Sequence, residues 1–475
     1  MTFGCKINFY DTQAIREAIL DLGYREVPLR GEARDAHGLD LLVVNNCTVT
    51  ARAGDRGAAA VRRLARQNPE AQIVVTGCLT EEDRRAVSVV PGVHFVVGNE
   101  EKDQIPALLQ GAGLRPTRGR RSRDIFELSA SRFSHRTRAF LKVHDGCDSF
   151  CSYCIIPFLR GKSKSRTRDD VVAEARRFAE AGHREIVLTG IHLSQYGRDL
   201  RGEDTRLVAL LRELRTIDGI DRVRLSSIGE GAFSDEFVAA FQEDPGLCRF
   251  FHIPLQSGSD AVLGRMRRDY DVAVYLGTID RIRELLPDAM IATDLMVGFP
   301  GETEEEFAES LATARRSEFA KMHIFPYSPR PRTKAAQLPD PVPADVVTAR
   351  MREARRLDAE LAAAHRQSRV GTEAQVLVER HRDGRARGSA RAGFEVTFPA
   401  PGARESWWNR EVAVRIIGER DGRLEGEPLV VRGAAVRNDA VRNDAIQNDA
   451  IRNDAIRNDA GRSAVTAATG GAEDE

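Results

Sequence analysis

Apolar runs that end at polar turns recur along the first part of the chain. The segment LDLLVVNNC (39–47) is such a run, AQIVVTGC (71–78) repeats the plan, and VHFVVGN (93–99) repeats it again. Continuous apolar runs are typical of strands buried on both faces of a parallel sheet. Because helical stretches such as 55–67 separate the runs, residues 1–114 are predicted to form an N-terminal parallel α/β domain.

A second series of apolar runs follows a basic linker at 115–138. Strands are predicted at 139–143, 185–190, 222–228, 249–255, 290–300 and 321–329. Helical patterns separate these strands, and the last helix, at 344–369, is long and charged. Residues 139–368 are therefore predicted to form an open or partial (β/α)6 barrel, with its chemistry at the carboxyl ends of the strands.

The pattern changes again after residue 369. Short runs such as EAQVLVER, GFEVTF and EVAVRIIG alternate between Gly-rich turns, which predicts a small antiparallel β-barrel at 369–432. Five VRNDA-like pentapeptides follow at 436–460. A five-residue period scatters Val and Ile around a helix and builds no apolar stripe. Residues 433–475 are therefore predicted to be a disordered, low-complexity tail.

Charge and composition narrow the class of protein. Lys plus Arg and Asp plus Glu number 71 each, so net charge does not argue for a nucleic acid partner. Basic residues nevertheless crowd 115–142 and 160–168, and a local patch can hold a polyanion, although solvated loop charge is the alternative. With no bilayer-spanning apolar segment and no signal peptide, we expect a cytoplasmic protein with reduced thiols and no membrane partner.

The most informative stretch is HDGCDSFCSYCIIP (144–157). It places Cys147, Cys151 and Cys154 at C-x3-C-x2-C spacing, after the first predicted barrel strand. Three thiolates leave one metal position open, where a substrate or cofactor can bind. A structural zinc site with His144 as fourth ligand stays open as an alternative. Zinc motifs usually come as two spaced pairs, however, and no second pair lies nearby, so an iron–sulfur cluster is favoured.

A second set of cysteines lies at the ends of the N-terminal apolar runs. Cys47 and Cys78 end the first two runs, and Cys5 precedes a helix predicted to start near Asp11. Loops at the carboxyl ends of parallel strands bind ligands, so these cysteines are candidates for a second site. Cys248 lies outside both sets and is predicted to be a small buried hydrophobic residue.

Together these motifs resemble the methylthiotransferase family of radical S-adenosylmethionine (SAM) enzymes. The N-terminal matches are FGCKINFYDTQAI, NNCTVTARA and VVTGC; the barrel matches are DGCDSFCSYCIIPFLRGKSKSR, LTGIHLSQYG, FHIPLQSGSDAVLGRMRR, DLMVGFPGETEEEF and FPYSPRPRT. The resemblance covers roughly residues 2–432 and ends in a β domain called TRAM. NNCTVT and GIHLSQYG look most like the tRNA branch that acts on N6-threonylcarbamoyladenosine at position 37, beside the anticodon.

The resemblance implies two [4Fe–4S] clusters and a radical reaction. The C-x3-C-x2-C triplet would hold the cluster whose open iron binds SAM, and the triplet Cys5, Cys47 and Cys78 would hold a cluster whose open iron carries sulfur. Cleavage of SAM would give a 5′-deoxyadenosyl radical that takes hydrogen from C2 of the adenine, and a second SAM would methylate the inserted sulfur. The C2–H bond is unactivated, which explains the need for a cofactor radical.

The resemblance also implies contacts and partners. The residues expected to bind SAM are Tyr153, Thr189, Gly190, Ser226, Ser227, Asp294, Val297, Gly298, Phe325 and Tyr327. Those expected to bind RNA by charge or stacking are Arg160, Arg166, Arg387, Trp407 and Trp408. Adjacent tryptophans on a strand cannot both point inward, so one is expected to be exposed, whereas Phe394 and Phe398 are expected in the core. The expected partners are tRNA and a reductase or flavodoxin-type electron donor, and the chain is expected to be a monomer.

Some positions depart from the family pattern, and other functions stay open. Only three residues precede Gly4, so we expect that either the start codon was called late or the family's first strand is lost. SSIGEGAF (226–233) places Glu230 one position late, and the family's Gly-Tyr-Ser-Glu-Asn-Tyr-like stretch of the β domain survives only as GSARAGF. The alternatives are methylthiolation of another tRNA adenosine, such as isopentenyladenosine, methylthiolation of a ribosomal protein side chain, and a non-catalytic RNA-binding protein with a structural metal.

Overall fold

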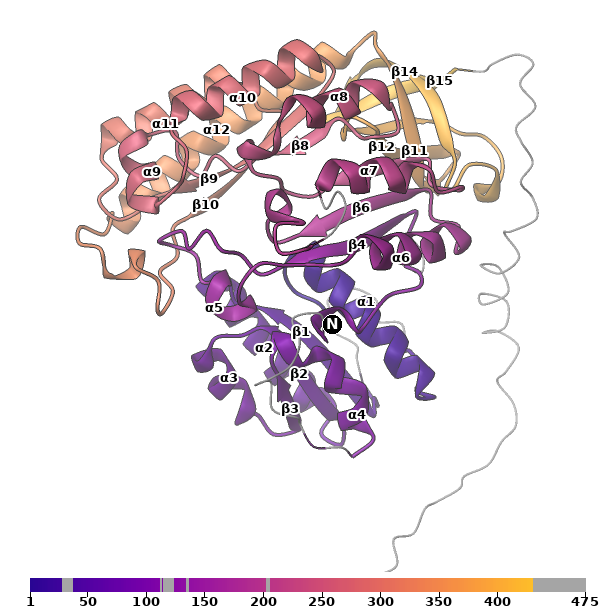
Figure 1. The fold of residues 1–475 in the computed structure, drawn as a ribbon, viewed down its shortest axis with the longest axis vertical. Helices are drawn as coiled ribbons and strands as arrows, with labels where there is room; N and C mark the ends of the chain where they lie inside the picture. Colours follow the sequence, from indigo (N-terminus) through magenta and orange to yellow (C-terminus); the bar gives the residue numbers. More distant parts are fainter. Residues whose placement is uncertain (28–36, 112, 114–123, 134–135, 202–205, 430–475) are drawn as a thin grey trace, which may run out of the picture. The chain divides into compact units, whose positions relative to one another are not determined.

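The computed structural model describes residues 1–27, 37–111, 113, 124–133, 136–201 and 206–429. Residues 1–429 belong to one unit of the chain, whose helices and strands are labelled in Figure 1. The predicted disordered tail at 433–475 and the most basic part of the linker, 114–123, lie outside the described residues. Within the described part, no helix is both long enough and apolar enough to cross a membrane.

A parallel sheet forms at the N-terminal end, where the sequence predicts it. Its strands pair in the order β1 (Leu41–Cys47), β2 (Gln72–Cys78) and β3 (Val93–Val97). Helices α2 (Ala51–Gln67) and α3 (Glu81–Ser88) bury apolar side chains against one face. Helices α1 (Lys6–Asp21) and α4 (Ile105–Leu109), the latter after the 3-10 turn η1 (Asn99–Gln104), cover the other face. Burial on both faces explains why the strands are apolar runs.

The first three residues run alongside β1. Thr2 forms a single parallel bridge to Asn45 on β1. The N–H of Phe3 donates to the carbonyl of Asn45 at 2.8 Å, and the N–H of Asn45 donates to the carbonyl of Met1 at 2.9 Å. These bonds fix the turn that leads into Cys5 and α1.

The central part is a partial parallel barrel. Its strands are β4 (Arg138–Asp145), β6 (Glu185–Gly190), β7 (Arg222–Leu225), β8 (Phe250–His252), β9 (Met290–Val297) and β10 (Lys321–Pro326). Isolated bridges, including Ser227 to His252, connect β7 to β8. Among the described residues β10 pairs only with β9, so the barrel is open between β10 and β4. The short β5 (Lys164–Ser165) pairs antiparallel with the end of β4.

Helices cover the outside of the barrel, and polar residues face its inside. The outer helices are α6 (Arg168–Glu180), α7 (Leu207–Arg215), α8 (Asp235–Glu243), α10 (Val272–Leu285), α11 (Glu304–Ser317) and α12 (Ala344–Arg369). Shorter elements lie in the connections: α5 (Ile156–Arg160), α9 (Asp260–Met266), η2 (Asp124–Phe126), η3 (Leu193–Gln195), η4 (Glu230–Ala232) and η5 (Ala335–Gln337). Apolar residues such as Leu188, Val223 and Phe251 pack outward in the main core. Because side chains alternate along a strand, their neighbours Glu185, Arg224, Ser226, His252, Asp294 and His323 face inward, into what we call the lumen.

The linker predicted at 115–138 packs against the barrel at its described end. Ala130 and Phe133 are buried in the barrel core. The N–H of Ala130 donates to the carboxylate of Glu174 on α6 at 2.8 Å. This end of the segment is therefore part of the barrel rather than a free connector.

The C-terminal part is a closed five-stranded barrel. Its strands are β11 (Glu373–Arg382), β12 (Arg385–Ala390), β13 (Glu395–Pro399), β14 (Glu411–Arg420) and β15 (Arg423–Pro428). All pairings are antiparallel except that of β13 with β15, which is parallel, so the prediction of an antiparallel barrel is corrected at this pair. Phe394 and Phe398 are buried in its core, as predicted.

The two tryptophans lie in a turn, not on a strand. They follow the 3-10 turn η6 (Arg404–Ser406), and both are half-buried. The indole N–H of Trp407 donates to the carbonyl of Pro401 at 2.9 Å, and the guanidinium of Arg404 lies 5.2 Å from the Trp408 ring centroid. Strand alternation therefore does not apply to these tryptophans, and the prediction that one of them is exposed is wrong. Arg387, the other RNA candidate in this barrel, is half-exposed and paired with Glu395 at 2.7 Å.

Candidate active site

The C-x3-C-x2-C loop follows β4 and is held by backbone contacts. A side chain at Gly146 (φ +72°) would meet the carbonyl oxygen of Lys162 at 1.9 Å, so only glycine fits there. The N–H of Cys154 donates to the carbonyl of Cys151 at 3.0 Å, which tightens the turn between these two ligand candidates. Between Cys147 and Cys151, Phe150 adopts a left-handed φ of 47°. Backbone contacts thus fix the shape of the loop.

The three thiols of this loop are suited to binding a positively charged metal centre. Burial raises the pKa of Cys154 to about 12 and also raises that of Cys147. Thiolates in such surroundings need a positive partner, which an iron–sulfur cluster supplies. One protein cation already contributes, because Arg268 donates to the sulfur of Cys151 at 3.4 Å.

The seventh cysteine, Cys248, lies outside both triplets. It is a fully buried core residue, as predicted.

His144 is not placed as a fourth ligand of this loop. Its Nε2 lies 2.7 Å from the hydroxyl of Ser163, and its Nδ1 accepts the N–H of His192 at 3.4 Å. Burial lowers the pKa of His144 to about 4, so the ring is neutral. Because both ring nitrogens are occupied, the structure argues against the zinc alternative that needs this histidine.

The second triplet converges from three elements of the N-terminal part. Cys47 and Cys78 are register partners at the ends of β1 and β2. Cys5 caps α1, and a Cβ at the preceding Gly4 would lie 3.1 Å from the sulfur of Cys47. Burial, together with the nearby thiols of Cys78 and Cys5, raises the pKa of Cys47 to about 11. The thiols of Cys47, Cys78 and Cys5 are therefore electrostatic neighbours, as the prediction of a second site expects.

Arg160 ends α5, the helix that follows the C-x3-C-x2-C loop in the chain, and is fully buried. Its Nη1 contacts both carboxylate oxygens of Asp145 at 2.9 and 3.0 Å, and its Nη2 donates to Oδ1 of Asn8 at 2.7 Å. Its Nε donates to the sulfur of Cys78 at 3.0 Å. The prediction that Arg160 binds RNA is therefore wrong, because every donor edge of the guanidinium is turned inside the protein.

Arg166 is also buried, which corrects a second RNA prediction. Its guanidinium pairs with Glu174 on α6 and lies 3.3 Å from the hydroxyl of Tyr10 on α1. The same hydroxyl donates to Glu174 at 2.9 Å. These three side chains join α1 to the barrel, so the charge of Arg166 serves packing within the chain.

A buried ion network continues this junction. Asp11 on α1 pairs with Lys102 and, at 3.0 Å, with Lys142 on β4. Lys142 also pairs with Asp145 at 2.7 Å. Burial alone would raise the pKa of Asp11, but Lys102, Lys142 and Arg160 outweigh it and hold the pKa below its usual value. All these carboxylates therefore remain charged and paired inside the protein.

Several residues expected to bind SAM gather at one end of the lumen. Tyr153, Phe325 and Tyr327 pack around Met296 and Phe299 in a common apolar cluster. A planar adenine fits such a wall. The cluster lies beside the C-x3-C-x2-C loop because Tyr153 belongs to both.

The remaining expected SAM residues differ in what they offer a ligand. The buried hydroxyl of Ser226 has no hydrogen-bond partner among the described residues, so it can accept one from a ligand. The hydroxyl of Thr189 already donates to the carbonyl of Val187 at 3.2 Å. Val297 packs its side chain outward, so only its backbone is available to the lumen. Close contacts leave no space for a side chain at Gly190 and Gly298, and the backbone of Ser227 bridges to β8.

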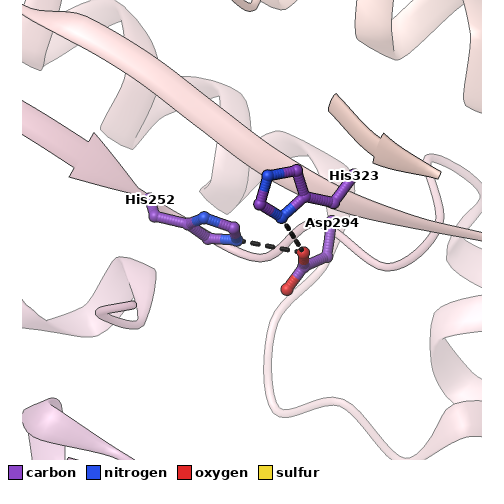
Figure 2. Close-up of side chains that lie close together, drawn as sticks. All are labelled: His252, Asp294 and His323. Carbon is purple, nitrogen blue, oxygen red and sulfur yellow. Dashed lines mark ion pairs between the residues drawn. The ribbon is translucent and has the colours of Figure 1, made fainter. Parts of the chain in front are cut away.

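Asp294 is paired with two histidines that sequence reasoning missed. In Figure 2 its carboxylate points to His252 from the neighbouring β8 and to His323 from β10, at 3.0 and 3.5 Å. Burial would raise the pKa of Asp294, but hydrogen bonds from the histidines lower it to about 2. The ligand atoms lie within 4.8 Å of one another, which would also suit a metal ion. The signal was available, since FHIPL and KMHIF carry histidine at inward positions of predicted strands.

Lys6 is a second residue that sequence reasoning missed. It follows Cys5 directly, opens α1 and is half-buried. Burial, together with the charges of Arg224 and Arg138 on the lumen face, lowers its pKa to about 8. Glu185 and the Cys5 thiol act in the opposite direction. Lys6 therefore lies next to the second cysteine triplet and close to charged residues that face the lumen.

Known families match the two cysteine-bearing parts of the chain. Residues 141–314 match the Radical SAM superfamily, and residues 1–98 match the group described as Uncharacterized protein family UPF0004. The solved structure of the radical S-adenosylmethionine methyltransferase TsrM from Kitasatospora setae is similar at a TM-score of 0.48 and 16% identity. It covers 67% of this chain and 73% of that chain.

Curated relatives match over most of their length. "Threonylcarbamoyladenosine tRNA methylthiotransferase MtaB" of Bacillus subtilis is 37% identical, covering 74% of this chain and 77% of its own. The protein of the same name from Chlamydia pneumoniae is 35% identical over 90% of this chain and 96% of its own. The "tRNA-2-methylthio-N(6)-dimethylallyladenosine synthase" of Acidothermus cellulolyticus is 36% identical over 84% of this chain and 83% of its own.

Proposed function

Because the chain belongs to the methylthiotransferase family of radical SAM enzymes, we propose that it adds a methylthio group to C2 of N6-threonylcarbamoyladenosine in tRNA. The relatives divide between this adenosine and dimethylallyladenosine at similar identity. Transfer of a methylthio group to tRNA is common to both. The relatives therefore do not distinguish the two adenosines, and the choice depends on the side chains that line the lumen of this chain.

The cysteines and the apolar wall have separate roles in this proposal. Bound at the two cysteine triplets, [4Fe–4S] clusters supply radical and sulfur chemistry together with SAM. The loop at Gly146 holds one triplet in place, and Arg268 donates to its Cys151 sulfur, which neutralises part of the thiolate charge. Tyr153 and Phe325 exclude water from the adenine side of the lumen. We also propose that a reductase or a flavodoxin-type protein supplies the electron for SAM cleavage.

The observation that carries the choice of substrate is the polar lumen. His252, Asp294 and His323 line it (Figure 2), and the side chain of His323 is 49% exposed, so a ligand can reach it. The threonylcarbamoyl group offers a carboxylate, a hydroxyl and amide N–H groups to such side chains. A dimethylallyl group offers none, and a site that desolvates polar groups without pairing them discriminates strongly against such a ligand.

Anaerobically reconstituted enzyme tests this function on matched RNAs. Anticodon stem–loops that carry either N6-threonylcarbamoyladenosine or dimethylallyladenosine are incubated with SAM, reductant and sulfide, and their nucleosides are analysed by mass spectrometry. We expect the 2-methylthio product from the first RNA and at most traces from the second. Product only from the dimethylallyl RNA would contradict the choice of substrate, and product from neither would contradict tRNA methylthiolation.

A further inference from the structure

Lys6 carries an ammonium group that is unpaired among the described residues and lies within electrostatic reach of the lumen-facing Arg224 and Glu185. It lies in the first turn of α1, next to Cys5, and α1 packs against the barrel strands β4 and β6. Within the residues that the structure describes, no carboxylate lies within 4.0 Å of its ammonium and no protein acceptor is hydrogen-bonded to it. An unpaired, half-buried ammonium is costly, so its presence needs a reason.

The carboxylates near Lys6 are already committed to arginines. Glu185 accepts from Arg222 at 2.5 Å and from Arg224 at 2.7 Å. Arg138, which also acts on the charge of Lys6, pairs with Glu379 at 2.9 Å. Since these arginines already balance the acids, the ammonium of Lys6 adds positive charge that no protein group compensates. A single carboxylate from a ligand would restore the balance.

We propose that the ammonium of Lys6 binds the carboxylate of the amino acid substituent on N6 of the substrate adenosine, and so selects this substrate. The inference rests on the proposed function, and it assigns the selection to one residue. Its position next to Cys5 also gives the contact a geometric consequence. A substituent anchored at Lys6 holds the attached base close to the second cysteine triplet, from which the sulfur must come.

The test measures binding of anticodon stem–loops to cluster-loaded protein by fluorescence anisotropy. The RNAs carry N6-threonylcarbamoyladenosine as the free acid, as its uncharged methyl ester, or unmodified adenosine. The variants are Lys6→Met, the charge-preserving Lys6→Arg, and the control Arg356→Met, which removes an exposed cation on the outer face of α12. Iron content and the electron paramagnetic resonance spectrum are recorded for each protein, because Lys6 adjoins a cluster ligand.

We expect wild type and Arg356→Met to bind the free acid roughly 10- to 100-fold more tightly than the ester, as a charged hydrogen bond predicts. Lys6→Met should lose this preference, and Lys6→Arg should keep most of it. The wild-type comparison of acid and ester stands even if Lys6→Met assembles poorly.

Three results would overturn the inference. Equal binding of acid and ester by wild type would mean that no cation reads the carboxylate. An unchanged preference in Lys6→Met would assign the carboxylate to another residue while leaving the proposed function intact. Equal weakening of all three RNAs by Lys6→Met would mean that Lys6 contacts a backbone phosphate. If wild type modifies only the dimethylallyl RNA, the proposed function fails, and this inference fails with it.

Discussion

Replacing Arg160 by methionine tests the junction between the two cysteine triplets. The change keeps much of the side-chain volume but removes the guanidinium, so that Asp145 loses one of its two cationic partners and keeps Lys142 and the N–H of Gly146. The side-chain oxygen of Asn8 and the sulfur of Cys78 each lose a donor in a place without solvent. Removing one partner of a buried ion pair costs about 3–5 kcal/mol, and we expect the free energy of unfolding to fall by that amount.

The assay is chemical denaturation of the anaerobic protein, with a surface pair as the matched control. Arg184 pairs with Asp221 at 3.1 Å, but both side chains are about one-third exposed. Exposed pairs contribute about 0–1 kcal/mol, so Arg184→Met should be close to wild type. Arg160 also contacts Asn8 and Cys78, so Arg160→Met removes more interactions than Arg184→Met does.

A second readout separates local from general destabilisation. Because hydrogen bonds to cluster sulfurs tune the reduction potential, Arg160→Met should shift the potential of the cluster at Cys78 to lower values. The potential of the cluster at Cys147, Cys151 and Cys154 should move less. If Arg160→Met unfolds like Arg184→Met and leaves both potentials unchanged, the assignment of Arg160 to this junction is wrong.

The remaining predictions concern the cysteines and pH. Cys151→Ala should abolish cleavage of SAM, whereas Cys47→Ala should keep cleavage and lose sulfur insertion. Cleavage is measured as release of 5′-deoxyadenosine. Equal loss of cleavage in both variants would contradict this division of roles between the two triplets. Arg224, Arg222 and Arg138 outweigh burial and lower the pKa of Glu185 to about 2. A lowered folded-state pKa stabilises the protein above the unfolded value of about 4.5, and this contribution is lost as the pH falls toward 2. Acid titration of the unfolding free energy should therefore be steeper for wild type than for Glu185→Gln, and parallel curves would refute this account.

The strands, and the placement of Cys47 and Cys78 at their ends, could be predicted from the sequence because both depend on local patterns. Apolar runs require burial on both faces, and β1, β2 and β9 form where such runs occur. Cys47 and Cys78 follow from the same logic, since parallel strands that end together bring their last residues together. The prediction that Phe394 and Phe398 lie in the core is also confirmed.

The sequence could not predict the partners of charged residues, because these come from distant parts of the chain. Arg160 looks like surface charge among basic neighbours, yet Asn8 and Cys78 enclose it from the N-terminal part. The pairing of His252 and His323 with Asp294 needs the register of three strands. Likewise, the parallel pairing of β13 with β15 follows from barrel closure and not from any turn signal.

The ion network around Asp11 bears on how a nucleotide reaches this site. Moving α1 away from β4 would break the buried Asp11–Lys142 pair and the hydrogen bond from Arg160 to Asn8, and breaking buried charged contacts is costly. We therefore expect the two halves of the site to stay locked during turnover. The RNA must then make the large movement, swinging its adenine out of the loop and into a fixed recess.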